Sequence, residues 1–330
     1  MKKKIIKIPS SELEKKIIDF CLNYTSIGNA KIISKIIVRA EKMEILTHGL
    51  HYFLHSLVPH LKNGITNHVV TKKKNFIYSK GNNGGGLGLV NIYNCLKDAS
   101  KIARKTGVCI YSAKNPGKIG AFRTYCSEIT ENNQLILMIK NTAPTQGLKK
   151  AKKALIGTNP IAIGIPGTNF IYDSSTSTVA TNAIRLKNKY NEKFNEIVGL
   201  DKKIKETNDP KKLLLNGAFL NTFAAGPFWF KSFYLGVAIE CIGALCGGKT
   251  SYRVGEHKGS RLFSKEGMLI IVIDKKVFPH YKAYLKEINV FLKELKKLNL
   301  RIPGSFNKKK EYLSLLKEDY DKLNSYNHKI

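Results

Sequence analysis

The sequence of 330 residues has little arginine, few acidic side chains and one tryptophan, Trp229. Of its 56 basic residues only seven are arginines, against 24 acidic residues, which gives a formal net charge of +32. Proteins that read nucleic-acid bases favour arginine and aromatic side chains gathered on one face. The lysines here are spread along the chain, so nucleic-acid binding is not expected as the main role. A field this positive would instead attract small anionic substrates.

Paired cysteines and long apolar runs are also lacking. The six cysteines include no C-x-x-C pair, which argues against a disulfide framework or a zinc site and favours free thiols in a reducing compartment. The apolar start at Ile5-Ile6 is too short for a signal peptide, and we expect no apolar run of membrane-spanning length. We therefore expect a cytoplasmic protein with no metal and no membrane partner.

The apolar periodicity predicts a mixed α/β protein with a helical N-terminal part. Strands are expected at residues 76–78, 108–111, 135–139 and 268–273. Helices are expected at 10–22, 29–46, 52–62, 87–106, 119–131, 178–196, 235–245, 279–299 and 309–325, and more weakly at 210–222. These elements suggest a helical domain (1–66), a sheet domain (67–278) and a C-terminal helical segment (279–330) that packs back on the first domain.

The glycine-rich run from Gly81 to Gly88 does not fit a dinucleotide-binding fingerprint. Counted from Gly84, the third glycine of G-x-G-x-x-G is replaced by Leu89. A mobile loop is the better interpretation of this run.

Residues 156–177 contain two short β-like runs, each bordered by small polar residues. Gly157-Thr158-Asn159-Pro160 precedes the first run, and Asp173-Ser174-Ser175-Thr176-Ser177 follows the second. Because Asp, Ser, Thr and Asn side chains prefer local backbone hydrogen bonds, such turns present N–H and O–H donors in fixed directions. They would suit a phosphorylated cofactor without a Rossmann loop. An ordinary hairpin between sheet strands is the alternative that the pattern leaves open.

Five motifs in order resemble the malate/L-lactate dehydrogenase family, whose fold is not the Rossmann fold. The family includes ureidoglycolate dehydrogenase, sulfolactate dehydrogenase, 2,3-diketogulonate reductase and cyclic imino-acid reductases. Thr47-His48-Gly49-Leu50 is similar to its Ser-His-Gly-Leu, Asp173–Ser177 to its Asp-Met-Ala-Thr-Ser, and Ile302-Pro303-Gly304-Ser305 to its Leu-Pro-Gly-Glu. Gly157–Pro160 stands as in the family, and Lys231 resembles the lysine of its Gly-Gly-Tyr-Lys-Gly.

The resemblance implies a fold, an activity and a set of site residues. The fold would be a central, mainly antiparallel sheet flanked by helices, with a helical N-terminal domain, in an obligate homodimer with the cofactor near the subunit interface. The activity would be an NAD(P)-dependent oxidoreduction of a small 2-keto or 2-hydroxy acid. The residues implied to contact NAD or NADP are Thr142, Asp173, Ser174, Ser175, Thr176, Ser177, Lys231, Ser232, Gly304 and Ser305.

Hydride transfer to a 2-keto acid also requires an acid for the developing alkoxide and a cation for the carboxylate. His48 is the expected acid, because an imidazole titrates near neutral pH. Thr47 would orient the substrate through its hydroxyl. The plainer alternatives are a helix-terminal histidine satisfied by backbone at 48 and a surface lysine at 231.

Three positions depart from the family pattern. Tyr52 stands where the family has the arginine that grips the carboxylate, and Lys118 stands where several members have an acid/base histidine. Bulkier residues, Phe228 and Ser232 among them, replace the glycines around Lys231. Lys118 would then serve as the acid or as the missing cation. The alternatives are a reductase of cyclic imino acids or a family member that has lost catalysis, with a polyanion-binding protein least favoured.

Overall fold

The computed structural model describes residues 3–62, 64–65, 68–82, 87–224, 226–254, 265–306 and 309–327, so most of the expected glycine loop lies outside the described residues. Its centre is a sheet of seven strands in the order β2-β3-β4-β13-β5-β8-β9, in which only β3 and β4 are parallel. The predicted mainly antiparallel sheet is confirmed. Its strands are β2 (His68–Lys73), β3 (Phe76–Gly81), β4 (Val108–Lys114), β5 (Gln134–Lys140), β8 (Ile161–Gly164), β9 (Ile171–Ser174) and β13 (Gly267–Asp274).

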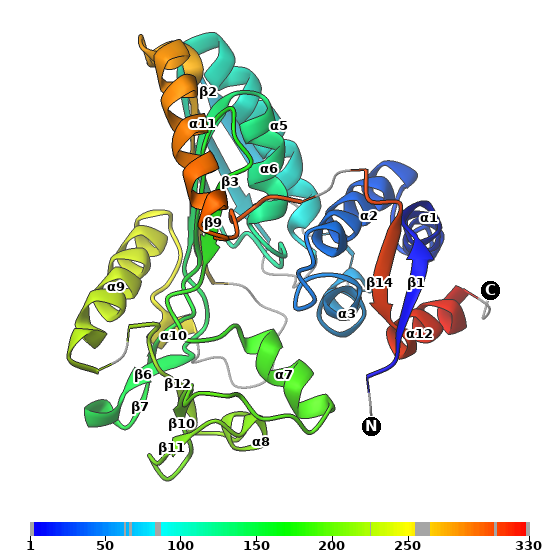
Figure 1. Cartoon of the computed structure of the whole chain (residues 1–330), viewed down its shortest axis with the longest axis vertical. Helices are drawn as coiled ribbons and strands as arrows, with labels where there is room; N and C mark the ends of the chain where they lie inside the picture. The colour runs from blue at the N-terminus through cyan, green and yellow to red at the C-terminus, as the bar shows by residue number, and fades with distance from the viewer. Residues whose placement is uncertain are drawn as a thin grey trace.

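Helices cover this sheet because its strands alternate between buried and half-exposed residues. In β13, Met268, Ile270 and Val272 are fully buried, and the residues between them are only partly so. The buried side packs against α5 (Leu89–Thr106) and α6 (Arg123–Glu131), whereas α9 (Trp229–Leu245) contacts β13 and β5 from the other side (Figure 1).

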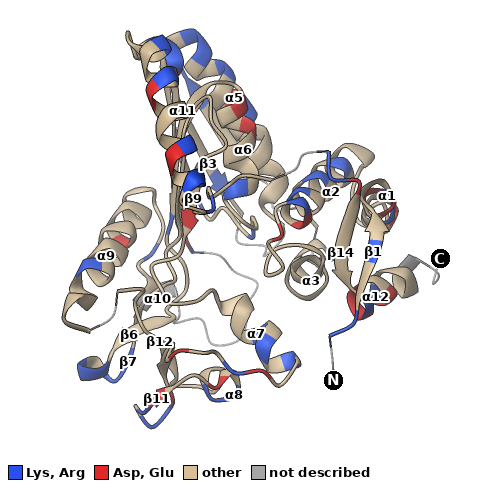
Figure 2. Ribbon diagram, viewed as in Figure 1, with Lys and Arg blue, Asp and Glu red and all other residues tan. Residues whose placement is uncertain are grey.

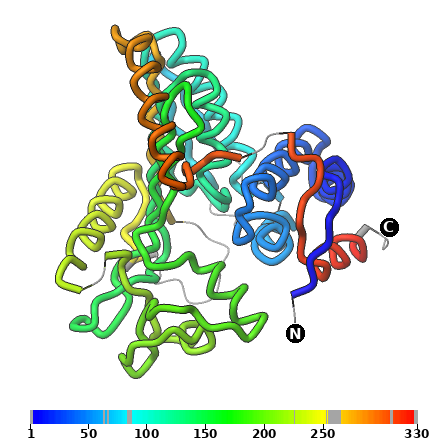
Figure 3. The backbone as a smooth tube through the Cα atoms, in the orientation of Figure 1, coloured from blue at the N-terminus to red at the C-terminus, as the bar shows by residue number. Residues whose placement is uncertain are grey.

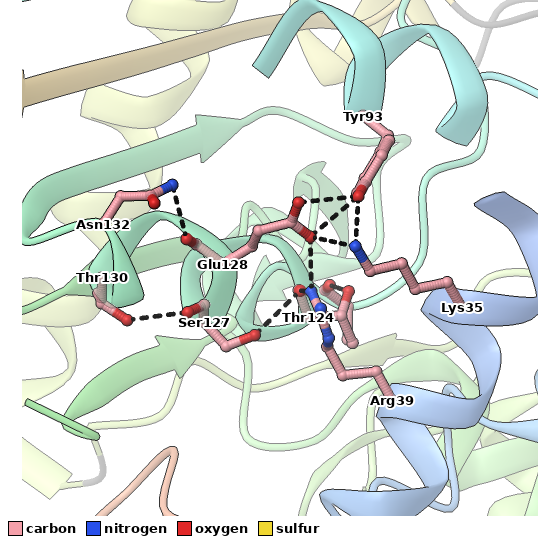
Figure 4. A network of polar contacts seen from close by, with 9 residues as sticks. Lys35, Arg39, Tyr93, Thr124, Ser127, Glu128, Thr130 and Asn132 are labelled. Atoms are coloured by element: carbon pink, nitrogen blue, oxygen red, sulfur yellow. Dashed lines mark hydrogen bonds and ion pairs between the residues drawn. The ribbon is translucent and has the colours of Figure 1, made fainter. Parts of the chain in front are cut away.

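The N-terminal helices form a separate layer beside the sheet. They are α1 (Ser10–Cys21), α2 (Ile27–Lys42), α3 (Leu50–Tyr52), the π-helical turn η1 (Phe53–Leu57) and α4 (Val58–Leu61). A polar network centred on the carboxylate of Glu128 on α6 connects this layer to the sheet domain. Glu128 binds Lys35 Nζ at 2.9 Å, Arg39 Nη1 at 3.2 Å and the hydroxyl of Tyr93 at 2.8 Å (Figure 4). This network joins α2 to α5 and α6.

The two ends of the chain meet in this N-terminal layer. Strand β1 (Ile5–Pro9) pairs antiparallel with β14 (Tyr312–Leu316), and α12 (Lys317–Asn327) packs on α1 (Figure 3). The helix predicted over 309–325 is therefore wrong in its first part. Leu313 and Leu315 are buried and Tyr312 and Ser314 are exposed, which is the alternation of a strand. By contrast, α11 (Tyr281–Lys297) lies on the sheet domain, where the hydroxyl of Tyr284 donates to the carbonyl of Pro166 at 3.0 Å.

A smaller sheet lies next to the end of the hairpin β8–β9, in the order β11-β10-β12-β6-β7. Its strands are β6 (Gln146–Leu148), β7 (Lys153–Ile156), β10 (Gly199–Leu200), β11 (Glu206–Thr207) and β12 (Phe219–Leu220). The weaker helix prediction at 210–222 holds for only four residues, α8 (Pro210–Leu213). The helix predicted over 178–196 is shorter in the structure, where it is α7 (Thr181–Lys189). The remaining short helices are η2 (Lys149–Ala151), η3 (Gly226–Phe228), α10 (Ser251–Val254) and η4 (Lys275–Val277).

The expectation that no segment reaches membrane-spanning length needs a correction at α9. Among the described residues, Gly226–Leu245 is one helical segment long and apolar enough to cross a membrane by length and composition. Its sheet-facing side is nevertheless fixed to the domain, since Ile239 and Glu240 are buried there. The side facing away from the sheet exposes large apolar side chains, such as Tyr234 and Leu245.

Candidate active site

The hairpin formed by β8 and β9 confirms the two β-like runs predicted between 156 and 177. Its register pairs Ile161 with Ser174, so the residues before β8 lie beside the residues after β9. The N–H of Thr176 donates to the carbonyl of Thr158 at 2.8 Å. Two polar segments that are separate in the sequence, 157–160 and 173–177, therefore form one surface, which we call the polar wall.

The hydroxyl groups of the polar wall and of the neighbouring Thr142 mostly form hydrogen bonds within the protein. Thr142 Oγ1 accepts from the N–H of Thr158 at 2.9 Å, and Thr176 Oγ1 accepts from Gln146 Nε2 at 2.7 Å. Ser177 Oγ donates to the carbonyl of Val179 at 2.8 Å. Thr142, Thr176 and Ser177 thus set the shape of the wall, while Ser174 and Ser175 are half-buried at its edge.

One buried carboxylate that sequence reasoning missed anchors the wall to α9. Glu240 Oε1 accepts from Asn159 Nδ2 at 2.6 Å and from the N–H of Gly157 at 3.1 Å. Glu240 Oε2 accepts from the N–H of Ser251 at 2.7 Å and from Asn141 Nδ2 at 3.2 Å. The signal that could have revealed it is that Glu240 is the one acidic residue in a mostly apolar helix of 17 residues.

His48 lies at the junction between the N-terminal layer and the sheet domain. Its Nδ1 shares a hydrogen bond with Thr47 Oγ1 at 2.9 Å, and its ring centroid is 5.0 Å from that of Tyr52. Burial lowers the pKa of His48 to about 4, the charge of Asp173 raises it, and the charge of Arg123 lowers it. The imidazole is therefore neutral at pH 7 and lies within the electrostatic reach of the polar wall.

Asp173 links the polar wall to the surroundings of His48. As the third residue of β9 it begins the segment 173–177, and its Oδ2 accepts from the N–H of Arg123 at 3.0 Å and from Arg123 Nε at 3.2 Å. Arg123 Nη2 also donates to the carbonyl of Asp173 at 3.1 Å. The motifs did not point to Arg123, although its residue type is rare in this chain.

A second group of charges surrounds Tyr52. Burial raises the pKa of Tyr52, the charge of Glu266 adds to this, and the charge of Arg185 opposes it. Glu266 forms a buried ion pair with Lys140. Burial lowers the pKa of Lys140, and the charge of the exposed Lys118 lowers it further. A Cβ at Gly120 would lie 3.9 Å from Tyr52 Cε1, so the segment that carries Lys118 borders Tyr52, whose ring is next to that of His48.

Glu41 on α2 stabilises the backbone that follows His48 through a hydrogen bond. Glu41 Oε1 accepts from the N–H of Leu50 at 2.5 Å, which satisfies the first turn of α3. A Cβ at Gly49 would lie 2.0 Å from the same oxygen, so a larger residue after His48 would displace this carboxylate. Burial raises the pKa of Glu41 to about 7.

The predicted cofactor lysine lies at the start of α9. Lys231 is exposed, with its Nζ 5.0 Å from the ring centroid of Phe228. Ser232 is buried, and its Oγ accepts from the N–H of Ala224 at 3.0 Å. A Cβ at Gly236 would lie 3.1 Å from Thr176 Oγ1, so this helix packs closely on the polar wall.

The last predicted motif runs beside the beginning of β9. The N–H of Ile171 donates to the carbonyl of Pro303 at 2.8 Å, and Gly304 has a φ of +87°. A Cβ at Gly304 would lie 2.6 Å from the carbonyl oxygen of Asn169. Ser305 lines a cleft of about 580 Å³ between α11 and the β8–β9 turn. Gly304 and Ser305 thus lie at the opposite end of β9 from residues 174–177.

Comparisons with known proteins extend over nearly the whole chain. A family model described as malate/L-lactate dehydrogenase matches residues 12–310. The malate/(S)-sulfolactate dehydrogenase of Methanothermus fervidus is 29% identical over 313 residues, which cover 90% of this chain and 88% of that protein.

Solved structures give the same result. The sulfolactate dehydrogenase of Methanocaldococcus jannaschii has a TM-score of 0.80 and 25% identity, covering 98% of this chain and 97% of its own. The delta1-piperideine-2-carboxylate reductase of Pseudomonas syringae pv. tomato has a TM-score of 0.81 at 19% identity, covering 97% and 99%, and shows the fold alone. The fold expected from the five motifs is confirmed.

Proposed function

The chain belongs to the malate/L-lactate dehydrogenase family of oxidoreductases, and we propose that it transfers a hydride between NAD(H) or NADP(H) and a small 2-keto or 2-hydroxy acid. The observation that carries this proposal is the position of Asp173. It begins the segment expected to hold the cofactor, and its charge acts on the imidazole expected to move the proton.

His48 is the residue that moves the proton. Because its pKa is lowered to about 4, it is a neutral base at pH 7 and is ready to take the proton of a substrate hydroxyl. In the opposite direction, an alkoxide forming beside it would favour the imidazolium, which donates the proton back. The hydrogen bond between Nδ1 and Thr47 Oγ1 holds the ring, so Nε2 would be the nitrogen that exchanges the proton with the substrate.

The residues of the polar wall fit a dinucleotide. Next to the wall, Gln146 donates from Nε2 to Thr176, and its Oε1 is buried without a hydrogen-bond partner in the described part of the chain; Lys231 supplies a cation at the start of α9. Ser174, Ser175 and Lys231 would bind the cofactor directly, with Thr142, Asp173, Thr176, Ser177 and Ser232 shaping its site. Gly304 and Ser305, at the other end of β9, would contact only a part of the cofactor that extends along this strand. When bound, the nicotinamide supplies or accepts the hydride.

Lys118 is the cation that we assign to the substrate carboxylate. The family arginine is replaced by Tyr52, and the charge of Lys118 reaches the neighbouring pair of Lys140 and Glu266. Arg185, whose charge reaches Tyr52, is the second candidate. Lys118→Ala should raise KM for the acid with little effect on cofactor affinity, and an unchanged KM would transfer the role to Arg185.

The exposed face of α9 supports a homodimer. Phe230, Tyr234 and Leu245 are 42%, 61% and 86% exposed in one chain. Figure 2 shows lysine and arginine on many other elements but little charge on this helix. Contiguous exposed apolar surface of this kind marks an interaction site. Tyr234→Asp should convert a dimer to a monomer in light-scattering measurements.

Trp229 provides the test of the proposed function, because it is the first residue of α9 and lies two positions from Lys231. Titration with NADH and NADPH should quench its fluorescence saturably in the wild type and equally in His48→Ala. Turnover should then be measured with oxaloacetate, sulfopyruvate, pyruvate and a cyclic imino acid. His48→Ala should abolish it.

The outcomes separate the alternatives. Quenching without turnover of any substrate would indicate a family member that has lost catalysis. Turnover of only the cyclic imine would favour the reductase activity of the Pseudomonas relative. No quenching at millimolar cofactor would refute the proposal.

A further inference from the structure

His51, His55 and Asp319 form a cluster of metal-ligating side chains apart from the residues assigned above. His51 Nδ1 lies 2.9 Å from Asp319 Oδ2, and His55 Nε2 lies 3.2 Å from Asp319 Oδ1. The candidate ligand atoms of all three residues lie within 4.8 Å of one another. Each oxygen of one carboxylate therefore has its own imidazole nitrogen.

The local fold brings the two imidazoles to one side of their helical segment. His51 lies in α3 and His55 in the π-helical turn η1, four residues later, and their ring centroids are 4.5 Å apart. π-helical turns occur frequently at functional sites. The side chain of Asp319 is 2% exposed and that of His55 is 35% exposed. An ion could therefore enter past His55 and reach a carboxylate that is shielded from water.

We propose that this cluster binds one divalent transition-metal ion, with Zn²⁺ as its representative. Nitrogen and oxygen ligands at about 2.0–2.2 Å from a tetrahedral Zn²⁺ lie about 3.3 Å from each other. His51 Nδ1 and His55 Nε2 lie 2.9 and 3.2 Å from different oxygens of Asp319, so each nitrogen–oxygen pair is close to this spacing, and a small rotation of the carboxylate would present one oxygen to an ion held by both imidazoles. Two imidazoles and one carboxylate suit Zn²⁺, Co²⁺ or Ni²⁺ better than Mg²⁺ or Ca²⁺, and a water molecule would complete the coordination.

Lys189 on α7 competes for the same carboxylate. Its Nζ is 3.4 Å from Asp319 Oδ1 and 2.7 Å from Glu318 Oε1. When an ion binds Asp319, Lys189 would lose that carboxylate but keep its ion pair with Glu318. The charge of Lys189 would therefore remain paired. Removing its charge should make metal binding tighter.

Metal binding here would connect two distant parts of the chain. Asp319 lies on α12, the last described helix, whereas His51 comes three residues after His48. A bound ion would clamp α12 to the segment that carries His48 and Tyr52. The site is independent of the proposed hydride transfer, since none of its ligands has a role in that reaction.

Titration calorimetry with ZnCl₂ on the metal-free full-length protein tests the proposal. The wild type should bind one Zn²⁺ per chain at this site. His55→Ala should weaken binding by at least about tenfold, because even loss of residues that only orient metal ligands costs this much. Since the His55 side chain is partly exposed, the variant should keep its fold, and circular dichroism would verify this.

Lys189→Met should bind Zn²⁺ severalfold more tightly than the wild type. His280→Ala and Cys241→Ser, which change an exposed histidine and the exposed cysteine elsewhere, should bind as the wild type does. Visible absorption of a Co²⁺ complex, present in the wild type and lost in His55→Ala, would give a second readout. Equal Zn²⁺ affinity in the wild type and His55→Ala, or weaker binding in Lys189→Met, would overturn the proposal.

Discussion

Arg123 and Asp173 form an ion pair whose two charges both act on the imidazole of His48, with Arg123 Nε 3.2 Å from Asp173 Oδ2. The pair connects the first residue of α6 to the third residue of β9. Its two charges act in opposite directions on the pKa of His48, which burial has already lowered. Burial therefore sets the direction of the His48 pKa shift, and the pair adjusts it while holding Asp173 in place at the end of β9.

Substitutions of the two partners should shift the pKa of His48 in opposite directions. Arg123→Gln removes a positive charge and should raise it from about 4, while Asp173→Asn removes a negative charge and should lower it further. Oxidation of a hydroxy acid needs the neutral imidazole, so it is lost as pH falls through this pKa. The acid limb of kcat/KM should move to higher pH in Arg123→Gln and to lower pH in Asp173→Asn. Shifts in the same direction would contradict this electrostatic role.

Glu41 should make the protein less stable as pH rises. Its pKa is raised from 4.5 to about 7 in the folded state, so the folded protein holds a proton that the unfolded chain releases between these values. The free energy of unfolding should therefore fall across this window, by roughly 3 kcal/mol at most. Glu41→Gln retains an acceptor for the N–H of Leu50 but cannot titrate.

Urea denaturation of wild type and Glu41→Gln at several pH values checks this. The variant should gain stability relative to the wild type from pH 4.5 to 7 and keep a constant difference above pH 7. A difference that is flat across the whole range would show that Glu41 does not hold a proton in the folded state.

Gly49→Ala should disturb the segment that carries His48. The new Cβ would lie 2.0 Å from Glu41 Oε1, so the carboxylate must leave the N–H of Leu50. We expect a loss of about 1–3 kcal/mol in unfolding free energy from the unsatisfied buried groups, together with a fall in kcat. The matched control is Gly28→Ala in α2, where nothing lies within 4 Å of the added Cβ. That control should be neutral or slightly stabilising.

The sequence predicted well those elements whose pattern is local. Residues 268–273 are apolar and β-branched enough to identify β13 without any partner. The pairing of β1 with β14 was not predicted, because Ile5 and its partner Leu316 are about 300 residues apart and neither run alternates strictly. The leucines at 313, 315 and 316 fit a helix as well as a strand.

The candidate site also contains residues that the sequence pointed to and residues that it did not. His48, Tyr52 and Lys118 were proposed as site residues from their places in motifs, and Tyr52 lies between the ring of His48 and the segment that carries Lys118. Arg123 and Glu240 were missed because their partners lie 50 and about 80 residues away in the sequence. The low number of arginines could have pointed to Arg123. The chain has only seven, and two of them, Arg39 and Arg123, form the ion pairs that join α2 and β9 to α6.

Glu240→Gln should weaken both the fold and cofactor binding. The carboxylate accepts hydrogen bonds from the N–H of Gly157, the N–H of Ser251 and two asparagine amides, and it is 5% exposed. A glutamine would turn its own N–H₂ toward some of these donors and leave them unsatisfied. Each buried unsatisfied group costs about 1–3 kcal/mol, so the variant should lose about 2–4 kcal/mol of unfolding free energy.

The control for this substitution is Glu294→Gln on α11, which removes the same charge from an exposed pair with Lys297. It should change stability by less than about 0.5 kcal/mol. Because Glu240 anchors Gly157 and Asn159, the Trp229 titration should show a higher Kd for NADH in Glu240→Gln but not in Glu294→Gln. A stable Glu240→Gln variant with normal cofactor affinity would show that the wall is held by its backbone contacts alone.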